Sequence, residues 1–159
     1  MAARTPSQTV GPFFHEALRW NDDDRVPSND RGPSVILTGR VLDGAGNAVS
    51  DAIVEAWHQA SRGVRRMLTG HDGSFRLESP MPAGDIPHVE ILVFARGLLK
   101  PVRTRAYLVP IERARADPAL KPLGSSPRLT TLVATPARER EYRWDIHLQG
   151  PAETVFFRR

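Results

Sequence analysis

A histidine and a glutamate stand two residues apart at the start of the longest apolar run of the sequence, residues 87–97. The isoleucine, leucine, valine and phenylalanine of this run favour a packed β-strand, and a proline and a glycine mark its ends. Because side chains alternate across a strand, His88 and Glu90 point to the same face. Arg96 follows at the far end of the strand, where its permanent charge suits it to bind an anion. The pair is a metal site, the remnant of one, or a structural contact.

A facial triad for ferrous iron is one chemistry that this pair allows, because two histidines and a carboxylate leave positions open for substrate. The second histidine would come from elsewhere in the chain. The candidates are His58, His71 and His147. The His-x-Glu pattern is short and frequent, however, and a glutamate beside His88 can also simply hydrogen-bond the imidazole and hold its tautomer.

Composition excludes several other classes of function. The chain contains no cysteine, so disulfides and thiolate metal sites are excluded. Its formal net charge is +4, but the arginines are scattered rather than set in one helical stripe with aromatic residues, which argues against a nucleic-acid-binding surface. The aspartates at 22–24 lack the glycine and terminal glutamate of a calcium loop. The N-terminus lacks the apolar core of a signal peptide and no apolar run has membrane-spanning length, so we expect a cytoplasmic protein.

The elements that position these residues are expected to be short strands separated by turn signals about every 8–12 residues. The expected strands cover residues 35–42, 49–58, 66–69, 74–78, 87–95, 104–108, 129–134 and 142–149. A short helical turn is expected within residues 112–124, before Pro118 stops it. This pattern predicts an all-β, two-sheet β-sandwich with little helix, in which residues 1–34 form an extended N-terminal arm and loop and residues 35–159 form the sandwich domain.

Two segments carry further expectations. The last expected strand alternates clearly, with its inward set predicted to be Tyr142, Trp144, Ile146 and Leu148. The N-terminal segment 5–15 has two prolines and a glycine, which exclude helix and central strand, and yet it carries apolar side chains. It is either an arm that docks on another chain or a tail folded over its own core.

Four stretches of the sequence, in the right order and together spanning nearly the whole chain, resemble the intradiol ring-cleavage dioxygenases. The stretches are residues 5–12, 41–57, 87–107 and 145–157. The resemblance is specifically to the chain without metal in the two-chain members of this family. It implies a β-sandwich that assembles with a homologous β subunit into a hetero-oligomer.

The resemblance also implies a reaction. The family uses a non-haem ferric iron, Fe(III), held by two tyrosines and two histidines of the β subunit. With dioxygen it cleaves 3,4-dihydroxybenzoate, a catechol with a carboxylate, to 3-carboxy-cis,cis-muconate in aromatic catabolism. This chain alone is therefore expected to be inactive and to complete the substrate pocket of its partner.

The residues of this chain agree with a role without metal. The family's His-x-His pair stands here as His88-Val89-Glu90, so that one ligand position matches and the other does not. Ferric iron favours phenolate ligands, but the chain has only two tyrosines, Tyr107 and Tyr142, and we expect both to be core residues. His88 and Glu90 are therefore predicted not to bind iron, and no catalytic residue is expected in this chain.

Carried over by position, the resemblance assigns substrate binding to four residues. They are Thr9, Gly11 and Pro12 of the arm, and Arg96 after the central strand. A guanidinium at the mouth of a site is a good partner for the substrate carboxylate. The alternative for Arg96 is a surface or interface salt bridge. The link at 60–63 and the loop at 79–87 are expected to be shorter than in the family.

A free-standing β-sandwich binding module of the transthyretin type remains the alternative function, since the turns at 43–47 and 71–73 fit it equally well. A free module needs neither the N-terminal arm nor the apolar tail at 153–157, whereas an interlocked subunit does.

Overall fold

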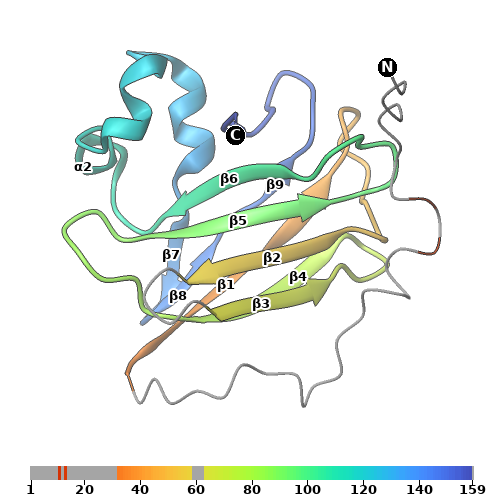
Figure 1. Ribbon diagram of the computed structural model, residues 1–159, viewed down its shortest axis with the longest axis horizontal. Coiled ribbons are helices and arrows are strands. Elements are labelled where there is room, and N and C mark those ends of the chain that lie inside the picture. Colours follow the sequence, from red (N-terminus) through yellow and green to blue (C-terminus); the bar gives the residue numbers. More distant parts are fainter. Residues whose placement is uncertain (1–10, 12, 14–31, 59–62, 159) are drawn as a thin grey trace, which may run out of the picture.

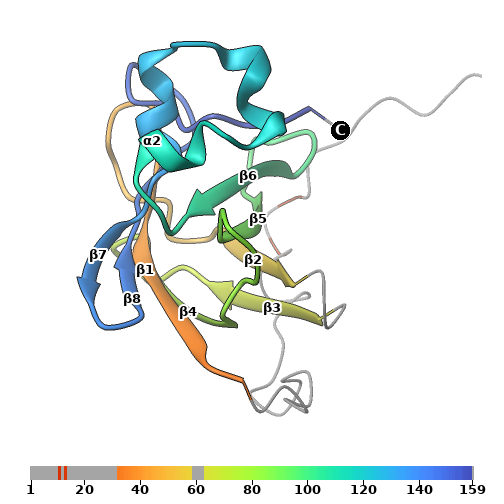
Figure 2. The ribbon, with the colours of Figure 1, turned by 90° about the vertical axis from the view of Figure 1, so that its left-hand side faces the viewer.

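The computed structural model describes residues 11, 13, 32–58 (the backbone alone at residue 58) and 63–158, and this part of the chain is built mainly from β-strands (Figure 1). Its strands are β1 (Ser34–Leu42), β2 (Ile53–His58), β3 (Gly63–Leu68), β4 (Ser74–Pro80), β5 (His88–Phe94), β6 (Val102–Tyr107), β7 (Thr135–Arg138), β8 (Glu141–Arg143) and β9 (Ile146–His147). They form a five-stranded and a four-stranded sheet. Figure 2 shows these sheets as two layers, with the helical segments at one end. The predicted all-β sandwich is confirmed.

The first sheet has the order β4-β1-β8-β7, and β9 extends it by pairing with β1. β1 and β4 are antiparallel, whereas β8 and β9 run parallel to β1. The segment that connects β8 to β9 lies very close to β1 at Gly39. A Cβ at this position would be 1.8 Å from the carbonyl oxygen of Trp144, so glycine is required there.

The second sheet has the order β3-β2-β5-β6, so β5 is the central strand that the sequence predicts. Antiparallel pairing sets Glu90 of β5 opposite Arg105 of β6, and Ile53 of β2 opposite Phe94. Since side chains alternate, these registers decide which residues share a face of the sheet. The face that carries His88 and Glu90 points away from the first sheet, and it is called the outer face below.

The inner face of β5 forms the core of the sandwich, as its alternation predicts. Val89, Ile91 and Val93 are at most 2% exposed and pack against buried residues of the first sheet, among them Leu37 and Leu77. Burying an aliphatic side chain of this size contributes about 1.5–3 kcal/mol. This core therefore anchors β5 and fixes the direction of the polar side chains on its outer face.

A second buried cluster surrounds Tyr107 at the end of β6, where three helical segments cover the sheet. They are α2 (Ile111–Ala114), η2 (Pro118–Leu123) and η3 (Pro127–Leu132), the last two being 3₁₀ helices. The helical turn expected after residue 112 is present as α2. Pro118 does not simply end helical structure, however, because it also begins η2, where a proline at the first position loses no hydrogen bond.

The prediction of a strand at residues 129–134 is wrong, because its first four residues belong to η3. Ser126 caps this helix by accepting a hydrogen bond from the Arg128 amide, and Pro127 occupies its first turn. The hydroxyls of Thr130 and Thr131 bond back to carbonyls three residues earlier. These local contacts satisfy the backbone without a neighbouring strand.

The segment that follows is also more broken than the sequence predicts. Residues 135–141, which lie between the last two expected strands, contain β7, which pairs with β8. The expected strand at 142–149 is interrupted at Trp144 between β8 and β9. Its inward set is nevertheless correct. Trp144 and Ile146 are buried, and Tyr142 and Leu148 pack against the same core.

The C-terminal tail lies along β6 of its own chain. The Phe157 amide donates to the Arg103 carbonyl at 2.8 Å, and the Thr104 hydroxyl donates to the Val155 carbonyl at 2.8 Å. The tail therefore does not discriminate between a free module and an interlocked subunit, because its apolar side chains have a place within this chain.

The described residues contain no helix that is long and apolar enough to cross a membrane. Most of the predicted arm and loop, residues 1–34, lies outside the described part, so the expected boundary at residue 34 stays a prediction.

Candidate functional site

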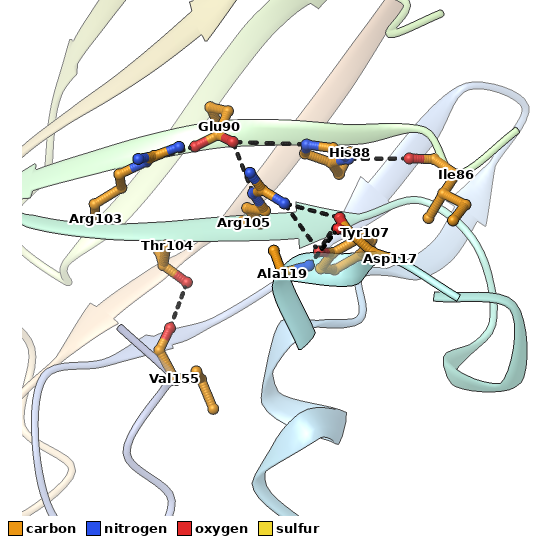
Figure 3. Close-up of polar contacts among 10 residues, drawn as sticks. All are labelled: Ile86, His88, Glu90, Arg103, Thr104, Arg105, Tyr107, Asp117, Ala119 and Val155. Carbon is orange, nitrogen blue, oxygen red and sulfur yellow. Dashed lines mark hydrogen bonds and ion pairs between the residues drawn. The ribbon is translucent and has the colours of Figure 1, made fainter. Parts of the chain in front are cut away.

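His88 and Glu90 lie at the beginning of β5 on its outer face, opposite Tyr107 and Arg105 of β6 (Figure 3). The sequence expectation that they share a face is therefore confirmed. Their surroundings are protein groups from β6 and from the start of η2, and each has a defined contact.

Glu90 is the centre of an ionic network. It is 7% exposed, and its two carboxylate oxygens accept hydrogen bonds from Nε of Arg103 at 2.9 Å and from Nε of Arg105 at 2.7 Å. Burial on its own would raise the pKa of Glu90. The contacts with His88, Arg103 and Arg105 outweigh that effect and hold the pKa at about 2. Glu90 is therefore ionised at neutral pH and is held between two guanidinium groups.

Arg105 extends this network to the helical segments. Its Nη1 donates to Oδ2 of Asp117 at 2.8 Å, and its guanidinium lies 5.4 Å from the centre of the Phe157 ring. Asp117 in turn caps η2, because its Oδ1 accepts a hydrogen bond from the Ala119 amide at 2.8 Å. One arginine side chain thus joins β5, η2 and the C-terminal tail.

Tyr107 is a buried structural donor. Its side chain is completely buried and its hydroxyl donates to Oδ2 of Asp117 at 2.7 Å. Burial raises the pKa of the Tyr107 phenol well above its ordinary value, and the contact with the Asp117 carboxylate raises it further. Tyr107 therefore stays protonated, as expected for a core residue and unlike a phenolate that binds ferric iron.

The ring of His88 lies between two hydrogen-bond acceptors. Its Nδ1 is 3.0 Å from the Ile86 carbonyl oxygen, and its Nε2 is 3.6 Å from Oε1 of Glu90. A neutral imidazole has one N–H and can donate to only one of them. The Ile86 carbonyl is the closer of the two acceptors, and the contact with Glu90 is an ion pair when the imidazole is protonated.

This donor set does not fit the iron centre that the resemblance implies. The Glu90 oxygens are taken by guanidinium groups, Tyr107 is protonated, and Arg105 occupies the space between Glu90 and Asp117 with its own positive charge. Within the described residues no three histidine, aspartate or glutamate side chains are grouped so that they could hold a metal ion. His147 lies on β9 of the other sheet and His71 in an exposed turn, so neither accompanies His88. The side chain of His58 lies outside the described part.

Arg96 stands in the turn that follows the opposite end of β5. It forms an ion pair through Nε with Asp51, and its side chain remains 60% exposed, compared with 15% for Asp51. The salt bridge weighed as an alternative is therefore present. It does not exclude substrate binding, because most of the Arg96 side chain stays exposed.

Of the three arm residues predicted to bind substrate, the structure describes only Gly11. Thr9 and Pro12 lie outside the described residues. Gly11 has a φ of +80° and open space around it, which is a conformation that suits glycine. Two surface clefts of about 430 and 530 Å³ open elsewhere in the described part, and neither is lined by Arg96 or Gly11. The four predicted substrate-binding residues therefore stay a prediction.

Sequence reasoning missed four residues that the structure joins to the candidate site, namely Asp51, Arg103, Arg105 and Asp117. Cross-strand register could have found Arg103 and Arg105, because it sets both of them beside Glu90. Extending the register of β2 and β5 by two residues would also have pointed to Asp51 as the neighbour of Arg96. The sequence alone does not give that register.

No family model matches the chain. Comparison with individual proteins nevertheless places it in a family. It is 38% identical to the protocatechuate 3,4-dioxygenase alpha chain of Burkholderia cepacia, in an alignment of 192 positions that covers 97% of this chain and 96% of the relative. The protocatechuate 3,4-dioxygenase alpha chain of Pseudomonas putida is 30% identical over 194 residues, with 96% and 95% covered.

Solved structures share the same fold. The dioxygenase domain of a dioxygenase–carbohydrate-binding protein fusion from Streptomyces sp. SirexAA-E superposes with a TM-score of 0.56 and 19% identity, over 93% of this chain and 99% of that chain. An intradiol ring-cleavage dioxygenase from Tetranychus urticae gives a TM-score of 0.53 at 11% identity, over 84% and 86%. The two-sheet architecture is thus the intradiol dioxygenase fold. Given the full-length similarity as well, the chain belongs to the family of protocatechuate 3,4-dioxygenase alpha chains.

Proposed function

We propose that this chain is the α subunit of a cytoplasmic protocatechuate 3,4-dioxygenase, in which it completes the substrate pocket of an iron-binding β subunit. The observation that carries the proposal is the similarity to alpha chains over almost the whole length of both proteins. Both alignments run over more positions than the 159 residues of this chain, so the relatives contain segments that it lacks. This agrees with the shorter link and loop expected from the sequence.

The reaction proposed for the complex is the intradiol cleavage of 3,4-dihydroxybenzoate by dioxygen to 3-carboxy-cis,cis-muconate. The iron supplies the activation of the catechol toward dioxygen, and we assign it to the β subunit. The contacts of Glu90 and Tyr107 support this assignment, because both groups are committed to an ionic network within the α chain.

The part of this chain in the reaction is to bind and orient the substrate. Arg96 binds the substrate carboxylate, and its exposed guanidinium supports this role because charge-assisted hydrogen bonds to a carboxylate are strong and directional. Thr9, Gly11 and Pro12 of the arm form a wall of the pocket. The positive φ of Gly11 supports a tight turn there, which allows the backbone to approach a flat ring closely.

The test compares this chain expressed alone with the same chain co-expressed with a β subunit of the family, and measures bound iron and turnover of 3,4-dihydroxybenzoate. We expect iron, colour and activity only in the co-purified complex. Iron bound by the isolated chain in a one-to-one ratio would contradict the proposal and revive the facial triad. Absence of both complex and iron would leave the binding module as the function.

A substitution tests the role of Arg96 within that complex. Arg96→Ala should raise the KM for 3,4-dihydroxybenzoate about 10- to 100-fold, the range expected for losing a charge-assisted contact. The iron content should not change. An unchanged KM would show that Arg96 serves only in the salt bridge.

A further inference from the structure

Asp51 and Arg96 face each other by the register of the second sheet. β2 and β5 pair up to Ile53 opposite Phe94, and continuing this antiparallel register by two residues sets Asp51 opposite Arg96. The ion pair therefore lies just beyond the ends of both strands. Both residues lie in turns just beyond the strand ends, so the backbone contacts of these turns decide how the pair is held.

The backbone on the Asp51 side is held by a buried threonine. The hydroxyl of Thr69, which is 7% exposed, accepts a hydrogen bond from the Ala52 amide at 2.9 Å and lies 2.8 Å from the Val49 carbonyl oxygen, to which it donates. The Thr69 amide also donates to the Ala52 carbonyl at 3.0 Å. These contacts fix the turn from which the Asp51 carboxylate extends.

The backbone on the Arg96 side is a tight turn. The Leu98 amide donates to the Ala95 carbonyl at 3.2 Å, and Gly97 has a φ of +86°, as position i+2 of a type II turn requires. Arg96 occupies position i+1 of this turn, so the direction in which its side chain leaves the backbone is set.

The contact with Asp51 leaves the outer edge of the guanidinium available. Arginine has five N–H donors, and the contact with Asp51 uses Nε. Among the described residues no other partner of Arg96 is present, so the two terminal nitrogens can bind a carboxylate in the bidentate manner that suits this group.

We infer that Asp51 is a positioning residue for the reaction, because it orients the guanidinium of Arg96 so that its outer edge receives the substrate carboxylate. This inference rests on the proposed function, in which Arg96 binds that carboxylate. An arginine ordered beforehand loses less side-chain entropy when substrate binds. Asp51 also repels the substrate carboxylate, but the positive guanidinium lies between the two anions, because Asp51 binds at Nε and the substrate would bind at the terminal nitrogens. The ordering effect therefore dominates.

The experiment uses the complex with the β subunit and two substrates, 3,4-dihydroxybenzoate and catechol, which lacks the carboxylate. For 3,4-dihydroxybenzoate, Asp51→Asn should raise the KM about three- to tenfold, as expected for a side chain that must be immobilised on binding, and change kcat less than about twofold. The KM for catechol should not change. Asp51→Glu, which keeps the charge, should recover most of the loss.

Two further variants make the result specific. Glu78→Gln removes the same charge from an exposed position on β4 and should leave both KM values unchanged. The double variant Asp51→Asn/Arg96→Ala should have the same KM as Arg96→Ala alone, because Asp51 acts only through Arg96.

The outcomes separate this inference from the proposed function. If Arg96→Ala raises the KM for 3,4-dihydroxybenzoate and Asp51→Asn leaves it unchanged or lowers it, the positioning role is wrong and the proposed function stands. An equal rise for catechol in Asp51→Asn would show a general structural effect and would also overturn the inference. If Arg96→Ala itself has no effect, the role of Arg96 in the proposed function fails first.

Discussion

Glu90 and Arg105 are directly opposite each other on β5 and β6, and the carboxylate accepts the Nε–H of the arginine at 2.7 Å (Figure 3). The glutamate that replaces a histidine of the family pattern is therefore the anionic centre of a network whose cations are guanidinium groups. Through Asp117 the network also connects the second sheet to η2. Its function within this chain is structural, and this can be measured.

Replacing Glu90 by glutamine tests the network directly. Glu90→Gln keeps the shape of the side chain but removes the anion of Arg103 and leaves Arg105 with Asp117 alone. We expect the free energy of unfolding to fall by about 1–3 kcal/mol, because the largely buried Arg105 loses one of its two anions, whereas water can solvate the more exposed Arg103. The measurement is urea unfolding of the variant against the parent chain. The matched control is Glu78→Gln, an exposed change that should cost less than about 0.5 kcal/mol. Equal effects of the two variants would show that the network contributes nothing.

The low pKa of Glu90 predicts how stability depends on pH. The pKa is about 2 in the folded chain and near 4.5 when the carboxyl is unperturbed, so the unfolded chain takes up the proton first as pH falls. The stabilisation is therefore complete above about pH 5.5 and is lost between about pH 4.5 and 2, by roughly 3 kcal/mol in total. Urea unfolding at pH 7, 5, 4 and 3 should show this loss in the parent chain and a smaller one in Glu90→Gln. If the free energy of unfolding falls equally with pH in both proteins, the loss comes from other carboxylates and not from Glu90.

Tyr107 is expected to matter for stability and not for iron. Tyr107→Phe removes the hydroxyl that donates to Asp117 and leaves that buried acceptor with one partner fewer, which should cost about 1–2 kcal/mol. The iron content and colour of the complex with the β subunit should not change. Thermal unfolding of the isolated chain and metal analysis of the complex are the two measurements. A loss of iron with intact assembly would mean that Tyr107 contributes to the metal site.

The alternation of β5 could be predicted because it depends only on local sequence. Val89, Ile91 and Val93 are buried as expected, and His88 and Glu90 share the opposite face. The helix at 127–132 could not be distinguished from a strand by its leucines and threonines, which occur in both. The deciding contacts are its serine cap and the hydroxyl bonds of Thr130 and Thr131.

The partners of the site residues could not be predicted because they depend on register. Arg105 is 15 residues from Glu90 in the sequence, and the turn between β5 and β6 decides that it stands opposite Glu90 and not one residue away, on the other face. The ion pair of Asp51 with Arg96 was missed for the same reason. A buried acidic residue on a central strand indicates that cations stand on neighbouring strands, but not which ones.

Gly97 connects the stability of the fold to the proposed substrate contact. Gly97→Ala forces a side chain into a φ of +86°, which should cost about 1–2 kcal/mol and disturb the turn that directs Arg96. Gly84→Ala is a matched control, because Gly84 has a φ of +98° and equally open surroundings but precedes β5 at its other end. Both variants should lose similar stability in thermal unfolding. In the complex with the β subunit, only Gly97→Ala should raise the KM for 3,4-dihydroxybenzoate. A similar rise of this KM in Gly84→Ala would show that the effect comes from lost stability and not from the direction of Arg96.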